Sequence, residues 1–214
     1  MAKINSTNNS SGSLTIDPAS GDSVATYAIG GTTKFETYVY DTDDSFRISD
    51  GTTDYLTITS DGVILKPKQA CAGANKSSQT SNVTGDSTTY TIINNNEIWD
   101  LNSDYNSGTG IFIAPKTGVY YISSCAYLLS MTTSHEILDF RIVCSNRFVR
   151  GSNYSSTSGT GIISSAAQPV VFGLVDMDVG DTAYCSIRVA GSTKTISAYG
   201  EAGFVSYITF ALMH

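Results

Sequence analysis

Apolar and polar residues alternate in a series of short runs between residues 30 and 67. The alternation has a period of two, which is typical of a strand with one buried face. Asp-Gly pairs at 50–51 and 61–62 separate some of the runs, and such a pair between alternating runs indicates a tight β-hairpin. The segment is therefore predicted to form a meander of strands. Its runs are 34–40, 45–49, 55–59 and 63–65.

This predicted meander has little apolar surface of its own. Each strand contributes two or three inward apolar side chains, such as Phe46 with Ile48 and Leu56 with Ile58. Fixing the backbone costs on the order of 1–2 kcal/mol per residue, which so little burial does not offset. Three copies wound about one axis would bury the apolar stripe and cover the strand edges. Residues 30–67 are therefore predicted to form an intertwined trimeric β shaft.

The strands predicted after Pro67 are longer, and turns separate them. Runs 137–144 and 182–190 both alternate, and in the first of them Asp139 and Arg141 lie opposite the apolar face. Such strands are typical of a β-sandwich, so residues 68–214 are predicted to form one, with a boundary near 66–69. The predicted inward residues are Leu138, Phe140, Ile142 and Cys144 in the first run and Ala183, Cys185, Ile187 and Val189 in the second.

Two further runs, 119–129 and 204–212, are apolar on both faces. In a monomeric antiparallel sandwich the outer face of each sheet meets water and should be polar. These runs therefore lie either centrally under long loops or at a subunit interface, and their tyrosines favour the interface. The candidate trimer-interface residues are Tyr121, Cys125, Tyr127, Tyr207 and Phe210, together with Phe46, Ile48, Leu56 and Ile58 of the shaft.

Composition and charge exclude several classes of partner. Charged residues are 14% of the chain and the net charge is −7, so clustered basic residues for a nucleic acid are not expected. No apolar run is long enough for membrane insertion, and the N-terminus lacks the apolar stretch of a secretory signal, so synthesis in a cytoplasm is expected. The cysteines form no Cys-x-x-Cys pair and are expected to be buried thiols rather than disulfides. They are Cys71, Cys125, Cys144 and Cys185.

A longer motif in the second half of the chain resembles a known family. Residues 102–121 carry a Tyr-Asn, a Gly-x-Phe, an x-Pro-x-x-Gly turn and a Tyr-Tyr strand, followed by Val-Gly-Asp at 179–181 and a closing strand at 204–212. Over residues 70–214 this order resembles the globular head of complement component one-q and its tumour necrosis factor-like relatives. The resemblance implies a ten-stranded jelly roll, a tight trimer through aromatic-rich inner sheets, binding through loops at one end, and no catalysis. Related heads sometimes hold a calcium ion near the trimer apex, which no residue pattern in this chain supports.

The upstream block departs from that family. The animal relatives carry a collagen stalk with Gly at every third position, which this chain lacks. The Asp-Gly-punctuated runs instead resemble the shafts of phage tail fibres. The expectation is a structural virion protein, a homotrimeric phage tail or neck fibre or spike made in the host cytoplasm, whose head adheres to a host cell-surface glycan or protein. Residues 1–29 would be an extended N-terminal arm that attaches to another virion protein.

Two other functions remain open at this stage. A capsid decoration (cement) trimer would use the same arm and head to stabilise the phage head. A bacterial secreted lectin-like adhesin is disfavoured by the missing signal sequence.

Catalytic, cofactor and metal residues are not expected. The two histidines, His135 and His214, have no partners that would make a catalytic group, and His135 is expected in an exposed loop. Asp residues at 41–44 are interpreted as turn formers rather than calcium ligands. Two loops are candidate receptor contacts because Tyr, Ser, Asn and Gly suit adaptable binding, with a solvated linker as the equal alternative. The candidate contact residues are Asn153, Tyr154 and Ser155 in a predicted loop at 151–159, and Met131 and Thr132 in a second one at 130–134.

Overall fold

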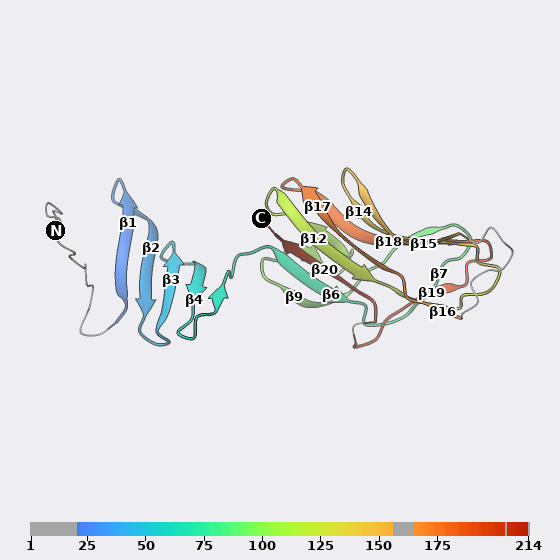
Figure 1. Ribbon diagram of the computed structural model, residues 1–214, viewed down its shortest axis with the longest axis horizontal. Coiled ribbons are helices and arrows are strands. Elements are labelled where there is room, and N and C mark those ends of the chain that lie inside the picture. The colour runs from blue at the N-terminus through green and yellow to red at the C-terminus, as the bar shows by residue number, and fades with distance from the viewer. Residues whose placement is uncertain (1–20, 156–164, 204, 214) are drawn as a thin grey trace. The chain divides into compact units, whose positions relative to one another are not determined.

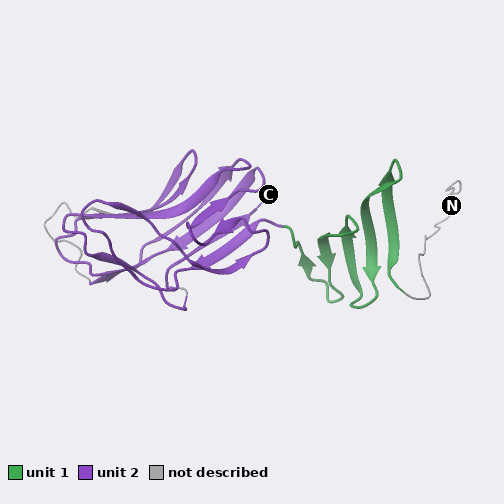
Figure 2. Ribbon diagram, turned by 180° about the vertical axis from the view of Figure 1, so that it is seen from behind, with its two compact units in different colours: residues 1–68 green, residues 69–214 purple. Residues whose placement is uncertain are grey.

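The computed structural model describes residues 21–155, 165–203 and 205–213, and the side chains of 152–155 are not among the described groups. The chain divides into two compact units, residues 1–68 and 69–214, which are coloured separately in Figure 2. No helix in the described ranges is long and apolar enough to span a bilayer. The described secondary structure consists of strands, so the all-β prediction is confirmed.

The first unit is an antiparallel meander of five strands in sequence order (Figure 1). Gly51 and Gly62 have φ of 88° and 87°, a conformation that glycine adopts without strain, which explains the Asp-Gly turns. The predicted hairpins are therefore confirmed. The strands are β1 (Ser23–Ile29), β2 (Thr32–Tyr40), β3 (Ser45–Ser49), β4 (Asp54–Ile58) and β5 (Ile64–Leu65).

The meander begins earlier than predicted. Residues 23–29, which were predicted to belong to the extended arm, form β1 and pair with β2, with Tyr27 opposite Phe35. A turn with positive φ at Gly30 and Gly31 brings the two strands together. Residues 1–20 of the predicted arm lie outside the described residues.

The second unit is a jelly-roll β-sandwich. One sheet has the order β17-β12-β20-β6-β9 and the other β10-β11-β18-β14-β15, with β8 also paired to β18. Neighbouring strands are mostly not consecutive in sequence, so the chain crosses repeatedly between the sheets, as a jelly roll requires. Four short strands, β16-β13-β19-β7, close one end. The bounds are β6 (Cys71–Asn75), β7 (Thr80–Thr84), β8 (Thr89–Thr91), β9 (Asn96–Asp100), β10 (Tyr105–Asn106), β11 (Ile111–Ile113), β12 (Gly118–Cys125), β13 (Tyr127–Leu129), β14 (Ile137–Cys144), β15 (Phe148–Ser155), β16 (Ala166–Ala167), β17 (Val170–Met177), β18 (Thr182–Ala190), β19 (Ile196–Tyr199) and β20 (Tyr207–Leu212).

The core lies between the two sheets, and aromatic rings fill its centre. The rings of Phe112 and Phe210 stack with centroids 4.4 Å apart, and Tyr120 meets Phe112 edge-on at 5.7 Å. The residues of β14 and β18 that were predicted to face inward are all buried, so the predicted inward faces of both strands are confirmed. Those residues are Leu138, Phe140, Ile142, Cys144, Ala183, Cys185, Ile187 and Val189.

All four cysteines are free thiols, as predicted. Cys125, Cys144 and Cys185 are buried and Cys71 is half-buried, and burial raises the pKa of Cys144 and Cys185 to about 11. Because the thiolate is the reactive form, these two thiols should not react with 5,5′-dithiobis(2-nitrobenzoate) in the native protein at pH 8. After unfolding in guanidinium without reductant, four thiols per chain should be titrated. Fewer than four would contradict the free thiols, and full reaction in the native state would contradict their burial.

Candidate functional site

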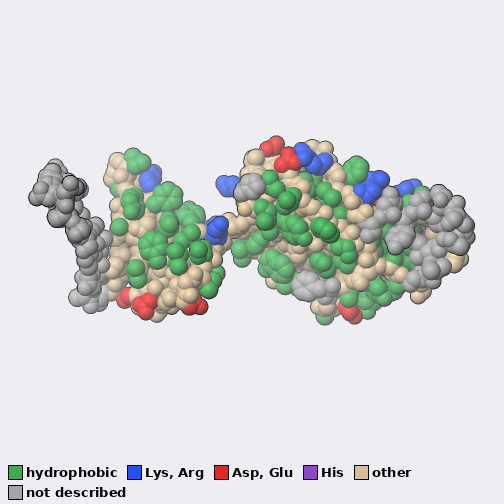
Figure 3. Space-filling view, viewed as in Figure 1, with side chains coloured by type: hydrophobic (Ala, Val, Ile, Leu, Met, Phe, Trp, Pro, Cys, Tyr) green, Lys and Arg blue, Asp and Glu red, His purple; other side chains and the backbone are tan. Residues whose placement is uncertain are grey.

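The outer face of the β17-β12-β20-β6-β9 sheet is apolar and exposed. On β17, Phe172 and Leu174 are each 65% exposed and Val170 is 41% exposed, and Tyr121 on β12 is 38% exposed. The strand register puts Tyr121 between Leu174 and Ala211, and Ser123 between Phe172 and Thr209. Figure 3 shows the hydrophobic side chains gathered over these strands. This surface, built on Tyr121, Val170, Phe172 and Leu174, is called the apolar face below.

Trp99, the only tryptophan of the chain, extends the apolar face across β6 and β9. It is 39% exposed and pairs with Gly73, which has no side chain. A Cβ built on Gly73 would lie 2.2 Å from the indole ring, so the indole covers that glycine closely. Only glycine at position 73 lets the ring lie flat on the sheet.

The sequence-predicted interface residues of the sandwich are not all on this face. Tyr121 is, and Tyr207, which is half-buried, projects to the same side of β20. Tyr127 is not: the predicted run 119–129 breaks at the buried Ala126, and Tyr127 lies on β13, where its ring meets Tyr199 edge-on at 5.6 Å.

Phe210 and Cys125 are corrections to the predicted interface. Phe210 is 2% exposed and points between the sheets, because Thr209 and Ala211 are the residues of β20 that project outward. Cys125 is 4% exposed, and its Sγ donates to the carbonyl of Val205 at 3.7 Å. The segment that leads into β20 therefore covers Cys125. Neither side chain is available to a second chain.

β17 carries the most exposed part of the apolar face, and none of its residues was among the predicted interface residues. Its buried residues are Val171, Val175 and Met177, so an apolar side chain faces each way along most of the strand. A signal was present, because residues 170–175 are apolar on both faces, the same pattern as in 119–129.

The first unit has its own exposed apolar face. The register pairs Phe46 with Val39 and Ile58, and Ile48 with Leu56, so the four predicted shaft residues do share one face. Phe46 is 39% exposed, and Val39 and Phe35 on the same side of β2 are 43% and 50% exposed. Figure 3 shows this stripe on the first unit. A single sheet buries one face only by meeting another layer.

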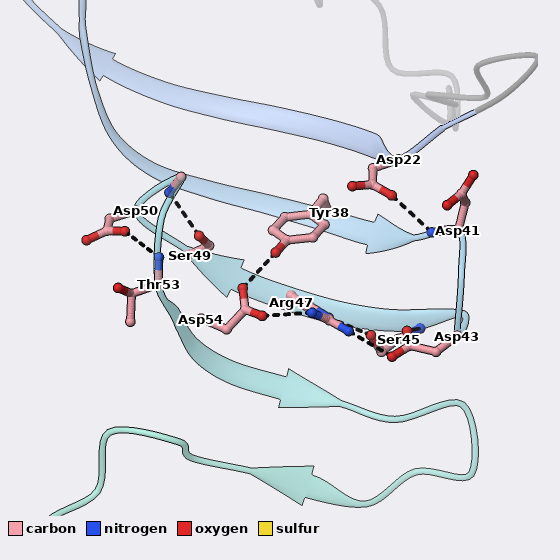
Figure 4. Close-up of polar contacts among 11 residues, drawn as sticks. Asp22, Tyr38, Asp41, Asp43, Ser45, Arg47, Ser49, Asp50, Thr53 and Asp54 are labelled. Carbon is pink, nitrogen blue, oxygen red and sulfur yellow. Dashed lines mark hydrogen bonds and ion pairs between the residues drawn. The ribbon is translucent and has the colours of Figure 1, made fainter. Parts of the chain in front are cut away.

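The opposite face of the meander is polar and internally paired (Figure 4). Arg47 forms ion pairs with Asp43 at 2.7 Å and Asp54 at 2.8 Å, and Tyr38 donates to Asp54 at 2.6 Å. Hydrogen bonds from Ser45, together with Arg47, lower the pKa of Asp43. The carboxylate of Asp43 accepts a hydrogen bond from the amide of Ser45, two residues further on, at 3.0 Å, which agrees with a turn-forming role. Among the described residues, no three His, Cys, Asp or Glu side chains are grouped to hold a metal ion.

The predicted receptor-contact residues are dispersed. Met131 is 4% exposed, which corrects its assignment to an exposed loop, because its amide pairs with the carbonyl of Ser165 and its side chain joins the core. Thr132 is exposed. Asn153, Tyr154 and Ser155 belong by their backbone to β15, paired with β14, so this segment is a strand rather than the predicted loop. The rest of the predicted loop, 156–159, lies outside the described residues.

His135 is fully buried, which corrects the expectation of an exposed loop histidine. The segment from Thr132 folds back on itself, since the amide of His135 donates to the carbonyl of Thr132 and the amide of Thr132 donates to Nδ1 of the ring at 3.0 Å. Nε2 is buried without a hydrogen-bond partner in the described part of the chain. The ring thus closes a turn with Thr132, whose Oγ1 also lies 3.0 Å from Nδ1.

Comparison with known proteins finds likeness in structure only. No family model matches the sequence, and no curated protein matches it. The globular domain of zebrafish complement 1qA protein is 15% identical, with 68% of this chain and 98% of that chain covered and a TM-score of 0.46. Eiger TNF from S. frugiperda is 17% identical, covering 68% and 93%, at 0.47, and murine APRIL is 14% identical, covering 68% and 100%, at 0.46.

At these identities the likeness concerns the fold, which the strand order already defines. The class of protein is therefore an all-β chain in which a five-stranded meander precedes a jelly-roll sandwich.

Proposed function

We propose that this chain is a non-enzymatic structural protein of a phage particle, a homotrimeric tail or neck fibre or spike whose jelly-roll head adheres to the host surface. The meander would form the shaft, and the first residues would attach to another virion protein. The observation that carries the proposal is the apolar face of the head, with Phe172 and Leu174 each 65% exposed.

Self-association follows from the energetics of that face. Full burial of a Val, Leu or Phe side chain contributes about 1.5–3 kcal/mol, and the face presents several of them side by side. Soluble monomers rarely expose large contiguous apolar patches. The meander adds a second stripe around Phe46 and Val39. Three copies around one axis would enclose both stripes, and a trimer is also what the resemblance of the head implies.

A fibre that attaches to a host is supported by the sequence of the meander and by the gain in affinity that three copies of one binding site provide. The Asp-Gly-punctuated strands of the meander resemble phage fibre shafts. Three weak binding sites on one axis gain affinity without a deep pocket in any one of them. Purified protein added to host cells should bind them and block adsorption of the phage that carries it. A capsid decoration protein would instead bind empty capsids and leave adsorption unchanged, and that result would replace the fibre proposal.

The oligomeric state is tested first. The purified full chain should scatter light as a species of three times the chain mass of 22.7 kDa. Trp99, 39% exposed in one chain, should emit at shorter wavelength and resist iodide quenching, because a neighbouring copy covers it. Dilution that dissociates the trimer should shift the emission to longer wavelength. A folded monomer at all concentrations, with a solvent-exposed tryptophan spectrum, would overturn the proposal.

A further inference from the structure

Four of the five arginines of the chain lie on or between neighbouring strands of the second sheet. Arg141 is on β14, Arg150 on β15 and Arg188 on β18, while Arg147 is in the turn between β14 and β15. Arg147 is paired with Asp176. The other three surround Asp139. Such a concentration of arginine is unexpected in a chain with a net charge of −7.

Asp139 holds the guanidinium groups in place. Its side chain is 5% exposed, and it accepts hydrogen bonds from Nε and Nη2 of Arg141 and forms an ion pair with Nε of Arg150 at 3.1 Å. Arg188 lies opposite Asp139 in the register of β14 and β18. Hydrogen bonding by Arg141, and then the positive charges of Arg141, Arg150 and Arg188, lower the pKa of Asp139.

The charges on this surface do not balance. Asp139 is paired with Arg141 and Arg150, while Nε of Arg188, across from it on β18, donates to the carbonyl of Ser87 at 3.2 Å. Three guanidinium groups thus share one carboxylate, which leaves two positive charges. Arg141 and Arg150 keep 30% and 43% of their side chains exposed. Since a guanidinium carries five donors, each arginine retains donors that can bind a second anion.

An exposed aromatic ring lies beside the arginines. Phe148, on β15, is 54% exposed. The guanidinium carbons of Arg141 and Arg150 lie 5.0 and 5.6 Å from the centre of its ring, within the range of a cation–π contact. The surface formed by Asp139, Arg141, Phe148, Arg150 and Arg188 is called the arginine face below.

We propose that the arginine face binds an anionic polysaccharide. This inference rests on the proposed function and names the ligand class that the head would recognise. Guanidinium groups bind carboxylate, sulfate or phosphate groups through paired hydrogen bonds, and the exposed ring of Phe148 offers a flat surface to the C–H face of a sugar. Arg150 lies directly opposite Arg141 on β15, and Arg188 lies diagonally from Arg141 on β18. The Cβ atoms of Arg150 and Arg188 are therefore each about 5–8 Å from the Cβ atom of Arg141.

The geometry favours a polysaccharide over a nucleic acid. The arginine face is part of an open sheet, where an extended polymer with spaced acidic groups can cross several strands. Duplex DNA carries a dense charge along its whole length, and the remainder of this acidic chain would repel it. The two positive charges that Asp139 does not neutralise suit a polymer that places only a few acidic groups on the arginine face at once.

The arginine face also stays accessible in the proposed trimer. It lies on the sheet that contains β14, β15 and β18, whereas the apolar face lies on the other sheet of the sandwich. The outer faces of the two sheets of a sandwich point in opposite directions. Packing of the apolar face against other copies therefore leaves the arginine face in solvent.

The test uses the full chain and two polymers that differ only in charge, dextran sulfate and neutral dextran of equal length. We expect binding to dextran sulfate that weakens with added salt, and none to neutral dextran. The double variant R150Q/R188Q keeps the Asp139–Arg141 pair and should bind dextran sulfate at least about tenfold more weakly. The control K34Q/K66Q removes the same charge from exposed lysines of the first unit and should bind within about twofold of wild type.

A second pair of measurements separates sugar recognition from charge alone. Phe148→Ala should weaken binding to dextran sulfate severalfold and leave binding to polyglutamate unchanged. Circular dichroism verifies the fold of each variant. The inference is overturned if R150Q/R188Q binds dextran sulfate like wild type, if polyglutamate binds as tightly as dextran sulfate, or if duplex DNA binds more tightly than both.

Host-cell binding distinguishes this inference from the proposed function. If the wild type is trimeric and binds host cells, and R150Q/R188Q binds those cells equally well, the arginine face is not the contact and the fibre proposal stands. If the wild type binds dextran sulfate through the arginine face but is monomeric and ignores host cells, the fibre proposal fails while the polysaccharide site stands.

Discussion

Replacing Leu174 by Asp is expected to abolish the trimer. Leu174 is 65% exposed in the single chain, so the substitution leaves the core of the sandwich intact. In the proposed trimer the same position is buried, and three carboxylates would lose their water without a partner. An unpaired buried charge costs about 3 kcal/mol or more per chain. Light scattering should therefore show no species of trimer mass at concentrations where the wild type is fully associated.

A matched control is available at the tip of the turn that follows β17. Val179 is 66% exposed, as exposed as Leu174, but it lies in the turn beyond Met177, the last residue of β17. Val179→Asp introduces the same charge and should remain trimeric. The emission of Trp99 should shift to longer wavelength in Leu174→Asp and stay unchanged in Val179→Asp. Two variants that associate equally well would show that the apolar face is not the contact between copies.

Which residues of a strand face the core could be predicted where charged residues mark its outer side. In β14, Asp139 and Arg141 alternate with Leu138, Phe140 and Ile142, and the structure buries all three apolar residues. The Asp-Gly turns of the meander were equally predictable, because the positive φ at Gly51 is a local requirement. The topology of the sandwich was implied by the family resemblance rather than by any local pattern.

Which residues of β20 face the core could not be predicted in the same way. Its residues are apolar on both faces, so nothing in the strand itself decides whether Tyr207 or Phe210 faces outward. The decision comes from pairing with β12, where Ile122 lies beside Phe210 and both point into the core. Pairing register is a property of distant segments, and the interface prediction for Phe210 failed for that reason.

Two further features depend on contacts that the sequence does not display. His135 follows a polar run and was predicted to be exposed, but the ring is buried by the turn it closes with Thr132. The arginines that surround Asp139 are separated by up to 47 positions, Arg141 to Arg188, and converge because β14 pairs with both β15 and β18. The alternation of apolar and charged residues in β14 predicts that Asp139 and Arg141 lie on its outer side. That Arg150 and Arg188 lie beside them follows only from the order of strands in the sheet.

Replacing Asp139 by Asn is expected to lower the free energy of unfolding by about 2 kcal/mol at pH 7, because Arg141 and Arg150 lose the carboxylate that pairs with them. The amide keeps the size of the side chain, so the effect is electrostatic. Urea unfolding at fixed protein concentration measures the loss. Asp176→Asn is the matched control: Asp176 pairs with Arg147 but is 66% exposed, so its loss should cost less than about 1 kcal/mol.

The same pair predicts how stability depends on pH. The arginines hold the pKa of Asp139 below its ordinary value of 3.8, so the carboxylate binds protons more weakly in the folded chain than in the unfolded one. Its contribution is complete above the unfolded pKa and is lost as pH falls through the lower, folded pKa. The difference in stability between the wild type and Asp139→Asn should therefore be constant from pH 7 to about pH 5 and shrink at lower pH. A difference that does not change down to the acid limit, or a cost at pH 7 no larger than that of Asp176→Asn, would mean that Asp139 does not hold the arginine face together.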